Sequence, residues 1–162
     1  TAQQNLVLTG IPEARRAEVE SILAEHDLSI GNGLSALRRY AMSCPALPTC
    51  GLAVAESERA MPGLIDVLEE RGYGDERVWI RTSGCPNGCS RPPTAEIGIV
   101  GRSLGLYHVY VGGDFEGTRL THLYKPDVKI EALPDVIGEA LDRWRAERKD
   151  GEAFGDWSDK AL

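Results

Sequence analysis

The sequence has few cysteines, few aromatic residues and no long apolar run. Its 162 residues include four cysteines, and aromatic residues make up 6% of the chain. So few cysteines exclude the disulfide-dense scaffold of small secreted domains. No apolar stretch approaches the roughly 18 residues that a membrane-spanning helix needs, and the start shows no signal-peptide pattern. We therefore expect a cytoplasmic protein that does not bind a membrane.

An excess of positive charge is also missing. Asp and Glu number 25 against 18 Lys and Arg, which gives a net charge of −7. The phosphate backbone of a nucleic acid would repel such a chain, so we expect no nucleic-acid partner. The length fits one ordinary domain, and the first residue is Thr1 rather than Met. We expect residues 1–162 to form a single domain that is a fragment of a longer chain.

Apolar spacing predicts both strands and helices. Strand-like runs lie at residues 6–8, 77–82, 95–100, 106–113 and 118–124. Helical patterns follow Pro12 and Pro62 and cover residues 53–60 and 132–148. The last helix is expected to bury one apolar stripe: Leu133, Val136, Ile137, Ala140, Leu141 and Trp144. Phe154 and Trp157 are expected to dock the polar tail. The predicted fold class is α+β, with a mixed sheet of short strands flanked by helices.

All four cysteines fall in two loops that contain proline. The segment "SCPALPTC" carries Cys44 and Cys50, and "SGCPNGCSRP" carries Cys85 and Cys89. A lone free cysteine usually behaves as a small buried apolar residue, but that does not explain two clusters. Structural disulfides do not suit a chain without export signals. The clustering therefore favours reduced cysteines that bind a metal.

The spacing of the cysteines leaves two kinds of metal site open. A zinc site commonly uses Cys-x₂₋₄-Cys pairs; Cys85 and Cys89 fit this range, whereas Cys44 and Cys50 lie farther apart. A [4Fe–4S] cube also takes four thiolates. Because the cube is larger than one ion, it accepts wider spacing. Spacing alone favours the iron–sulfur cluster only slightly.

Longer stretches around the cysteines carry a resemblance to a known family. The segments "SCPALPTCGLAVAESER" and "SGCPNGCSRP", the latter followed by "AEIGIVG", resemble the two cluster-binding segments of the siroheme sulfite and nitrite reductases. Both family spacings, Cys-x₅-Cys and Cys-x₃-Cys, are present. "QQNLVLTGIPE" is similar to the start of the C-terminal half of the sulfite reductase hemoprotein. "YHVYVGGDFEGTRL" and "RAERKDGEAFGDW" are similar to its last stretch. "CPALPTC" and "AESER" look more like assimilatory sulfite reductases than nitrite reductases.

The resemblance implies two cofactors, a [4Fe–4S] cluster and a siroheme. It implies that sulfite is the substrate, reduced to sulfide by six electrons, with nitrite as the alternative. Side chains cannot supply these electrons, so cofactors must. By resemblance the cluster ligands are Cys44, Cys50, Cys85 and Cys89, and Cys89 also bridges to the siroheme iron. The expected electron donor is a ferredoxin or a flavoprotein.

Two further residues of the second loop are candidates by resemblance. Asn87 and Arg91 are expected to bind siroheme carboxylates, although a simple turn residue and a solvated arginine are the alternatives. In the family, the Arg and Lys residues that bind sulfite lie in the segment before this one, and nothing here matches them. We therefore expect no catalytic residue in this fragment, and we expect the remainder of the reductase chain to be its partner. A non-enzymatic Cys₄ module that holds zinc or a lone cluster is the alternative.

Overall fold

A computed structural model describes residues 6–28 and 33–162. Internal contacts divide the chain into two units, residues 1–34 and 35–162, and each is described by itself. In the described ranges, no helix combines the length and the apolar character needed to cross a bilayer. The expectation of a single domain over residues 1–162 stays a prediction.

The described part of the first unit is a short helical segment. A 3₁₀ turn, η1 (Glu13–Arg15), leads into α1 (Arg16–Glu25), as the pattern after Pro12 predicted. None of the α1 residues is buried. The predicted strand at residues 6–8 is wrong: these residues form no strand, and Leu6 is 84% exposed. The physical reason is that a strand needs a neighbour for its backbone hydrogen bonds, and no described strand pairs with this segment.

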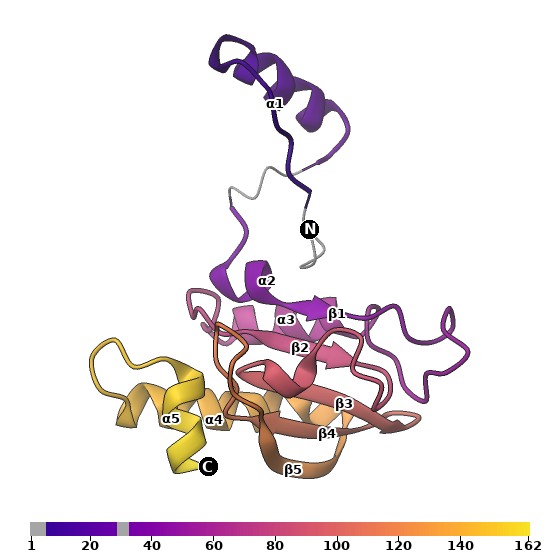
Figure 1. Ribbon diagram of the computed structural model, residues 1–162, viewed down its shortest axis with the longest axis vertical. Helices are drawn as coiled ribbons and strands as arrows, with labels where there is room; N and C mark the ends of the chain where they lie inside the picture. Colours follow the sequence, from indigo (N-terminus) through magenta and orange to yellow (C-terminus); the bar gives the residue numbers. More distant parts are fainter. Residues whose placement is uncertain (1–5, 29–32) are drawn as a thin grey trace. The chain divides into compact units, whose positions relative to one another are not determined.

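The second unit is built on one mixed sheet of five strands in chain order. The strands are β1 (Met42–Ser43), β2 (Ile80–Ser83), β3 (Ile97–Ser103), β4 (Leu106–Val111) and β5 (His122–Lys129). The pairs β1–β2 and β2–β3 are parallel, whereas β3–β4 and β4–β5 are antiparallel (Figure 1). The structure therefore confirms the predicted α+β class with a mixed sheet.

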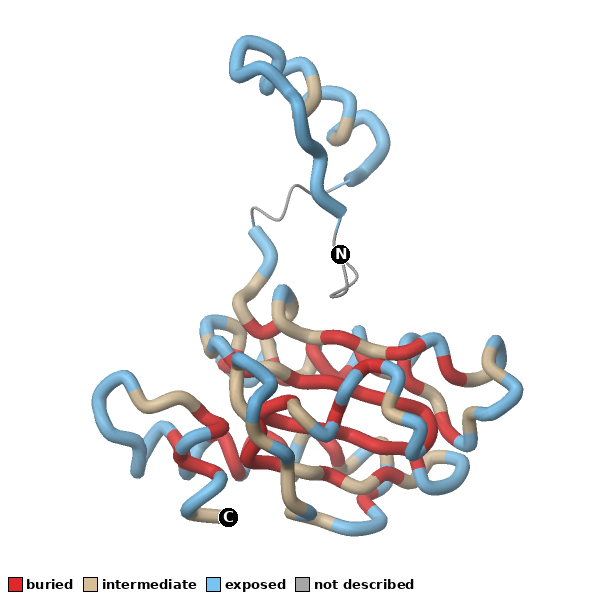
Figure 2. Tube along the Cα trace, in the orientation of Figure 1, coloured by how far each residue is buried: buried red, intermediate tan, exposed pale blue. Residues whose placement is uncertain are grey.

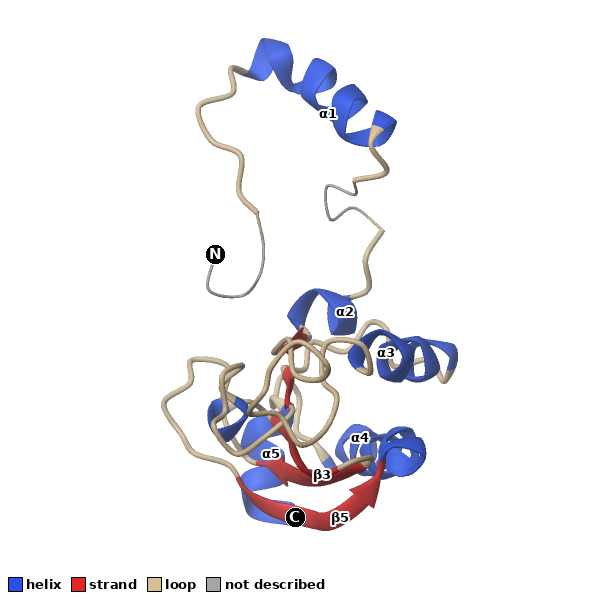
Figure 3. Ribbon diagram, turned by 90° about the vertical axis from the view of Figure 1, so that its right-hand side faces the viewer, coloured by secondary structure: helices blue, strands red, loops and turns tan. Residues whose placement is uncertain are grey.

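Two helices cover one face of this sheet, and long loops lie on the other (Figure 3). The covering helices are α3 (Met61–Glu70) and α4 (Leu133–Glu147); α2 (Ala36–Tyr40), η2 (Pro92–Thr94), η3 (Ile130–Ala132) and α5 (Phe154–Ala161) complete the unit. Pro62 lies in the first turn of α3, where its missing N–H costs nothing. The α4 stripe is confirmed: Leu133, Ile137, Ala140, Leu141 and Trp144 are buried, and Val136 packs partly buried against them.

The apolar core lies between the sheet and its helices, and burial concentrates in β2, β3 and β4 (Figure 2). The tail docks as predicted, since Phe154 and Trp157 are buried in α5. Phe154 packs edge-on against Trp144 with ring centroids 5.8 Å apart. The predicted helix at residues 53–60 is wrong, because this segment forms turns and bends. Its amides are used elsewhere: those of Val54 and Ala55 both donate to the Gly84 carbonyl, at 2.9 and 3.0 Å.

Candidate functional site

The two cysteine loops begin at the same end of the sheet, where the parallel strands β1 and β2 finish. In the parallel pair β1–β2, Met42 lies opposite Arg81 and Ser43 lies opposite Thr82. Cys44 therefore follows directly where β1 ends, and Cys85 comes two residues after the last residue of β2. The backbone N–H of Cys44 donates to the Thr82 carbonyl at 3.1 Å, which extends the strand pairing to the first ligand position. Carboxyl ends of neighbouring parallel strands are a usual location for sites.

A buried group of serines ties the loops to β2. The Ser57 and Ser90 hydroxyls both donate to the Thr82 carbonyl, each at 2.6 Å. The Ser83 and Ser90 hydroxyls lie 2.7 Å apart and are hydrogen-bonded to each other. All three serines are at most 1% exposed. Buried polar groups that are fully paired hold a single geometry, so these serines fix the backbone on both sides of the second cysteine pair.

Close packing around Gly84 adds a steric constraint. A Cβ atom at Gly84 would lie 2.5 Å from both the Ala46 Cβ and the Ala55 carbonyl oxygen. A Cβ at Gly101 on β3 would lie 2.6 Å from the Gly84 carbonyl oxygen. Only glycine permits this approach of backbones. The first cysteine loop, the segment after it and the second cysteine loop therefore pack directly against one another.

All four cysteines are free thiols in the structure. Cys44 and Cys85 are buried, Cys50 is half-buried and Cys89 is exposed. The Gly84 amide donates to the Cys44 sulfur at 3.4 Å, the kind of contact that stabilises a thiolate and tunes a cluster. Four free thiols on two adjoining loops, with an amide directed at one sulfur, are a donor set that fits an iron–sulfur cluster.

The four thiols are not gathered as a preformed metal site. Among the described residues, no three His, Cys, Asp or Glu side chains are grouped so that they could hold one metal ion. A zinc ion and a [4Fe–4S] cube both need thiolates brought together, so the choice between them rests on the sequence motifs.

The second loop turns sharply at the residues between and after its cysteines. Gly88 has a φ of 66° and Arg91 a φ of 60°, both in the left-handed region. The Arg91 amide donates to the Gly88 carbonyl at 2.7 Å, which closes the turn. Asn87 is exposed at its tip. Arg91 is exposed as well, and its Nη2 lies 3.8 Å from the Met42 sulfur. The loop therefore presents both predicted siroheme-binding side chains on the surface beside Cys89.

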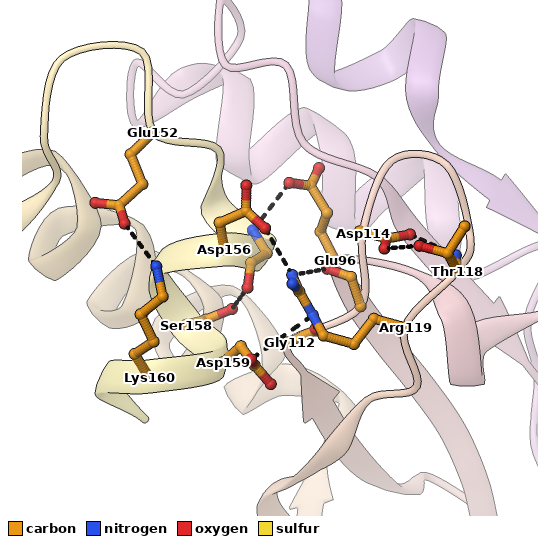
Figure 4. Close-up of polar contacts among 12 residues, drawn as sticks. Glu96, Gly112, Asp114, Thr118, Arg119, Glu152, Asp156, Ser158, Asp159 and Lys160 are labelled. Carbon is orange, nitrogen blue, oxygen red and sulfur yellow. Dashed lines mark hydrogen bonds and ion pairs between the residues drawn. The ribbon is translucent and has the colours of Figure 1, made fainter.

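The opposite end of β2 and β3 has a different character. A cavity of about 550 Å³ lies there, lined by residues that precede these strands and by carboxylates of the tail. Glu96, only 1% exposed, accepts hydrogen bonds from the amides of Trp79 and Gly155, both at 2.9 Å. Burial raises the pKa of Glu96, although the two amides oppose this. Arg119 pairs with Asp156 at 2.9 Å (Figure 4). Seven carboxylates against two arginines line this cavity, a charge balance that disfavours an anionic ligand.

The sequence did not predict Ser57, Ser83, Ser90 or Gly84 as site residues. Serines and a glycine beside cysteines are common in any loop, so no pattern distinguished them. The cysteine motifs, by contrast, were predicted together with their placement in two loops, the second of them directly after a strand.

No family model matches the chain. It is 48% identical over 97% of its length to the "Sulfite reductase [NADPH] hemoprotein beta-component" of a Methylobacterium species. It is 44% identical over 97% of its length to the protein of the same name from Chromohalobacter salexigens. The chain belongs to the nitrite/sulfite reductase family. Among solved structures, the NirA protein of Mycobacterium tuberculosis matches 99% of this chain with a TM-score of 0.83 and 26% identity.

The chain spans only part of each relative. It covers 26% of the Methylobacterium protein, 28% of the Chromohalobacter protein and 32% of the NirA chain. The relatives therefore have large regions outside this segment.

Proposed function

We propose that this chain is the cofactor-binding C-terminal part of an assimilatory sulfite reductase hemoprotein, which reduces sulfite to sulfide. One observation carries the proposal: four free cysteines lie on two loops at the ends of adjacent parallel strands, in a chain 44–48% identical to proteins named sulfite reductase hemoproteins. Nitrite reduction is the alternative within the family, and the names of these relatives favour sulfite.

In this proposal, Cys44, Cys50, Cys85 and Cys89 are the thiolate ligands of a [4Fe–4S] cluster. A cluster coupled to a siroheme supplies electrons one at a time to a bound anion. Cys89 is the exposed ligand, so its sulfur is the one accessible to a second group, and we assign it as the thiolate shared with the siroheme iron. Asn87 and Arg91, which lie on the surface beside it, are assigned to siroheme carboxylates. The Gly84 amide and the buried serines hold the loops in place and limit water near Cys44 and Cys85.

The chain lacks one part of the reaction, an identified group of arginines and lysines to bind and protonate sulfite. With 25 acidic against 18 basic residues, its overall charge opposes anion binding. We assign that group to the remainder of the reductase chain. The word NADPH in the names of the relatives favours a flavoprotein donor over a ferredoxin, because a flavin converts a hydride into single electrons. We keep the cytoplasm as the expected location.

A direct assay tests this function. The full-length protein is purified without oxygen and supplied with reduced methyl viologen and either sulfite or nitrite. We expect sulfide from sulfite at a higher kcat/KM than ammonia from nitrite, and no sulfide from the 162-residue chain alone. A full-length protein that holds zinc and produces neither product would establish the non-enzymatic Cys₄ module instead. Steady sulfide production by the short chain would show that an anion site lies within it.

A further inference from the structure

Arg81 is a buried arginine on β2, the strand that leads into the second cysteine loop. It is the second residue of β2 and only 2% exposed. A guanidinium carries five N–H donors and stays charged in proteins. Burying such a charge is costly unless an opposite charge and hydrogen bonds compensate it. The partners of Arg81 therefore need to be accounted for.

The described chain supplies no carboxylate to Arg81. Among the described residues, no Asp or Glu oxygen lies within the 4.0 Å of an ion pair to its guanidinium. Its Nη1 donates a long hydrogen bond, 3.4 Å, to the Thr94 hydroxyl. Its guanidinium carbon lies 4.1 Å from the centre of the Trp79 ring. No other hydrogen bond of its guanidinium occurs among the described residues. Its remaining nitrogens are not among the fully buried unpaired atoms, so they still reach solvent and are open to a ligand.

The positive charge of a second arginine, Arg91, acts on Arg81. Arg91 Nη2 lies 3.8 Å from the sulfur of Met42, and Met42 is the strand neighbour of Arg81. Burial lowers the pKa of Arg81 to about 10, and the positive charge of Arg91 adds to this effect. Two cations close together in a partly dry site attract an anion strongly.

A second polar group nearby also lacks an acceptor. The indole N–H of Trp79, the residue stacked on Arg81, is buried and has no hydrogen-bond partner among the described residues. Orphaned buried donors are rare in folded proteins. Arg81, with one long hydrogen bond, and the Trp79 indole, with none, are thus both short of acceptors among the described residues.

We propose that Arg81, together with Thr94 and Arg91, forms a carboxylate-binding site that is filled in the full-length protein. Arg81 lies four residues before Cys85, and Arg91 lies two residues after Cys89, so the site adjoins the second cysteine loop. Two sources have the right chemistry: a peripheral carboxylate of siroheme, or an Asp or Glu side chain from the remainder of the reductase chain. The siroheme source rests on the proposed function, whereas the side-chain source does not.

The test compares Arg81→Met with Arg102→Met in the full-length protein. Arg102 is an exposed arginine on the neighbouring strand β3, so its variant controls for the loss of one positive charge. Each protein is prepared from cells that make siroheme and from cells that do not. Two quantities are measured: the dissociation constant of siroheme, followed by absorbance during dialysis, and the thermal midpoint of the siroheme-free protein.

Each source predicts its own pattern. If siroheme supplies the carboxylate, Arg81→Met raises the siroheme dissociation constant roughly 10- to 100-fold, and the siroheme-free midpoint stays equal or rises. If a side chain supplies it, the siroheme-free midpoint falls well below that of Arg102→Met. If Arg81→Met does not fold but the charge-conserving Arg81→Lys does, the buried charge has a partner and the proposal stands.

One result overturns the inference. If Arg81→Met matches Arg102→Met in siroheme binding and has an equal or higher siroheme-free midpoint, Arg81 has no carboxylate partner. Failure of the proposed function gives a different result, namely a wild-type protein that never binds siroheme. In that case the thermal midpoints of the two variants still decide whether a side chain pairs with Arg81.

Discussion

Polar groups near the two ends of β2 differ in whether the chain itself supplies their partners. At its start, the chain pairs its own groups: two backbone amides satisfy Glu96, and Arg119 pairs with Asp156. At its other end, four thiols are free and Arg81 has no carboxylate among the described residues. The chain satisfies Glu96 at the first end, although the indole N–H of Trp79 beside it has no acceptor among the described residues. The second end has four free thiols and a buried arginine with one long hydrogen bond.

This difference separates structural from functional polar groups. A carboxylate that pins α5 to the sheet needs only backbone donors, which this fold provides. In the proposed function, the four free thiols and the buried arginine bind a metal cluster and an anion, which only cofactors or further polypeptide bring. Polar residues that remain unsatisfied inside an otherwise well-paired unit are therefore the ones assigned to binding.

The largest effect is expected when any one of the four cysteines becomes serine. We predict that Cys85→Ser abolishes cluster binding, because a cube with three thiolates is labile. The measurement is iron and acid-labile sulfide per chain after purification without oxygen. Thr49→Ser, an exposed change in the first cysteine loop, is the matched control and should retain full iron and sulfide. A Cys85→Ser protein with a full complement of both would show that the ligand set is wrongly assigned.

A smaller loss is expected at the acidic end. Glu96→Ala removes the acceptor of two amides, those of Trp79 and Gly155, and each unsatisfied amide costs about 1–3 kcal/mol. Denaturant melts of the purified protein measure this loss of unfolding free energy. The control is Glu131→Ala, an exposed glutamate, for which we expect about 0.5 kcal/mol or less. Iron content should not change in Glu96→Ala; loss of cluster would mean that the two ends are coupled.

The same carboxylate gives a pH dependence of known sign. Burial raises the pKa of Glu96 above its unfolded value, so the folded state binds this proton more tightly. Its contribution to stability is therefore fully present below the unfolded pKa of about 4.3. It is lost as pH rises through the folded pKa. Wild-type stability should therefore fall as pH rises from about 4.3 through the folded pKa of Glu96. Glu96→Gln cannot ionise, so denaturant melts of this variant should not show that fall. An unchanged pH profile would contradict the assignment.

The smallest effect is expected for one serine at the cysteine end. Ser90→Ala loses the hydrogen bonds to the Thr82 carbonyl and the Ser83 hydroxyl, at about 1 kcal/mol for each. We predict a modest loss of unfolding free energy and faster loss of iron in air, because the second loop is less firmly held. Ser103→Ala, at an exposed position at the end of β3, is the control. Equal rates of iron loss in the two variants would show that the serines do not secure the site.

Much of this molecule was predictable from its sequence. The apolar stripe of α4 and the four clustered cysteines are local patterns, and the structure places both where periodicity and spacing indicated. The helix expected at residues 53–60 does not form, because helix propensity is only a weak local preference. The amides of Val54 and Ala55 instead donate to the Gly84 carbonyl on a distant segment.

Other features depend on contacts between segments far apart in sequence. Ser57 and Ser90 meet at the Thr82 carbonyl across 25 and 8 residues of chain, which no local pattern encodes. In the sequence, Arg81 is indistinguishable from an ordinary strand residue, and only the structure shows that it is buried. The serine contacts and the buried arginine could therefore be found only from the fold.

The central claim is that the cysteine end of β2 holds a [4Fe–4S] cluster shared with a siroheme. The most direct measurement is the metal and acid-labile sulfide content of the full-length protein purified without oxygen, together with its visible spectrum. The account predicts about four iron and four sulfide per chain, with the intense bands of siroheme above the broad absorption of the cluster. Stoichiometric zinc without iron, sulfide or visible absorption would contradict it.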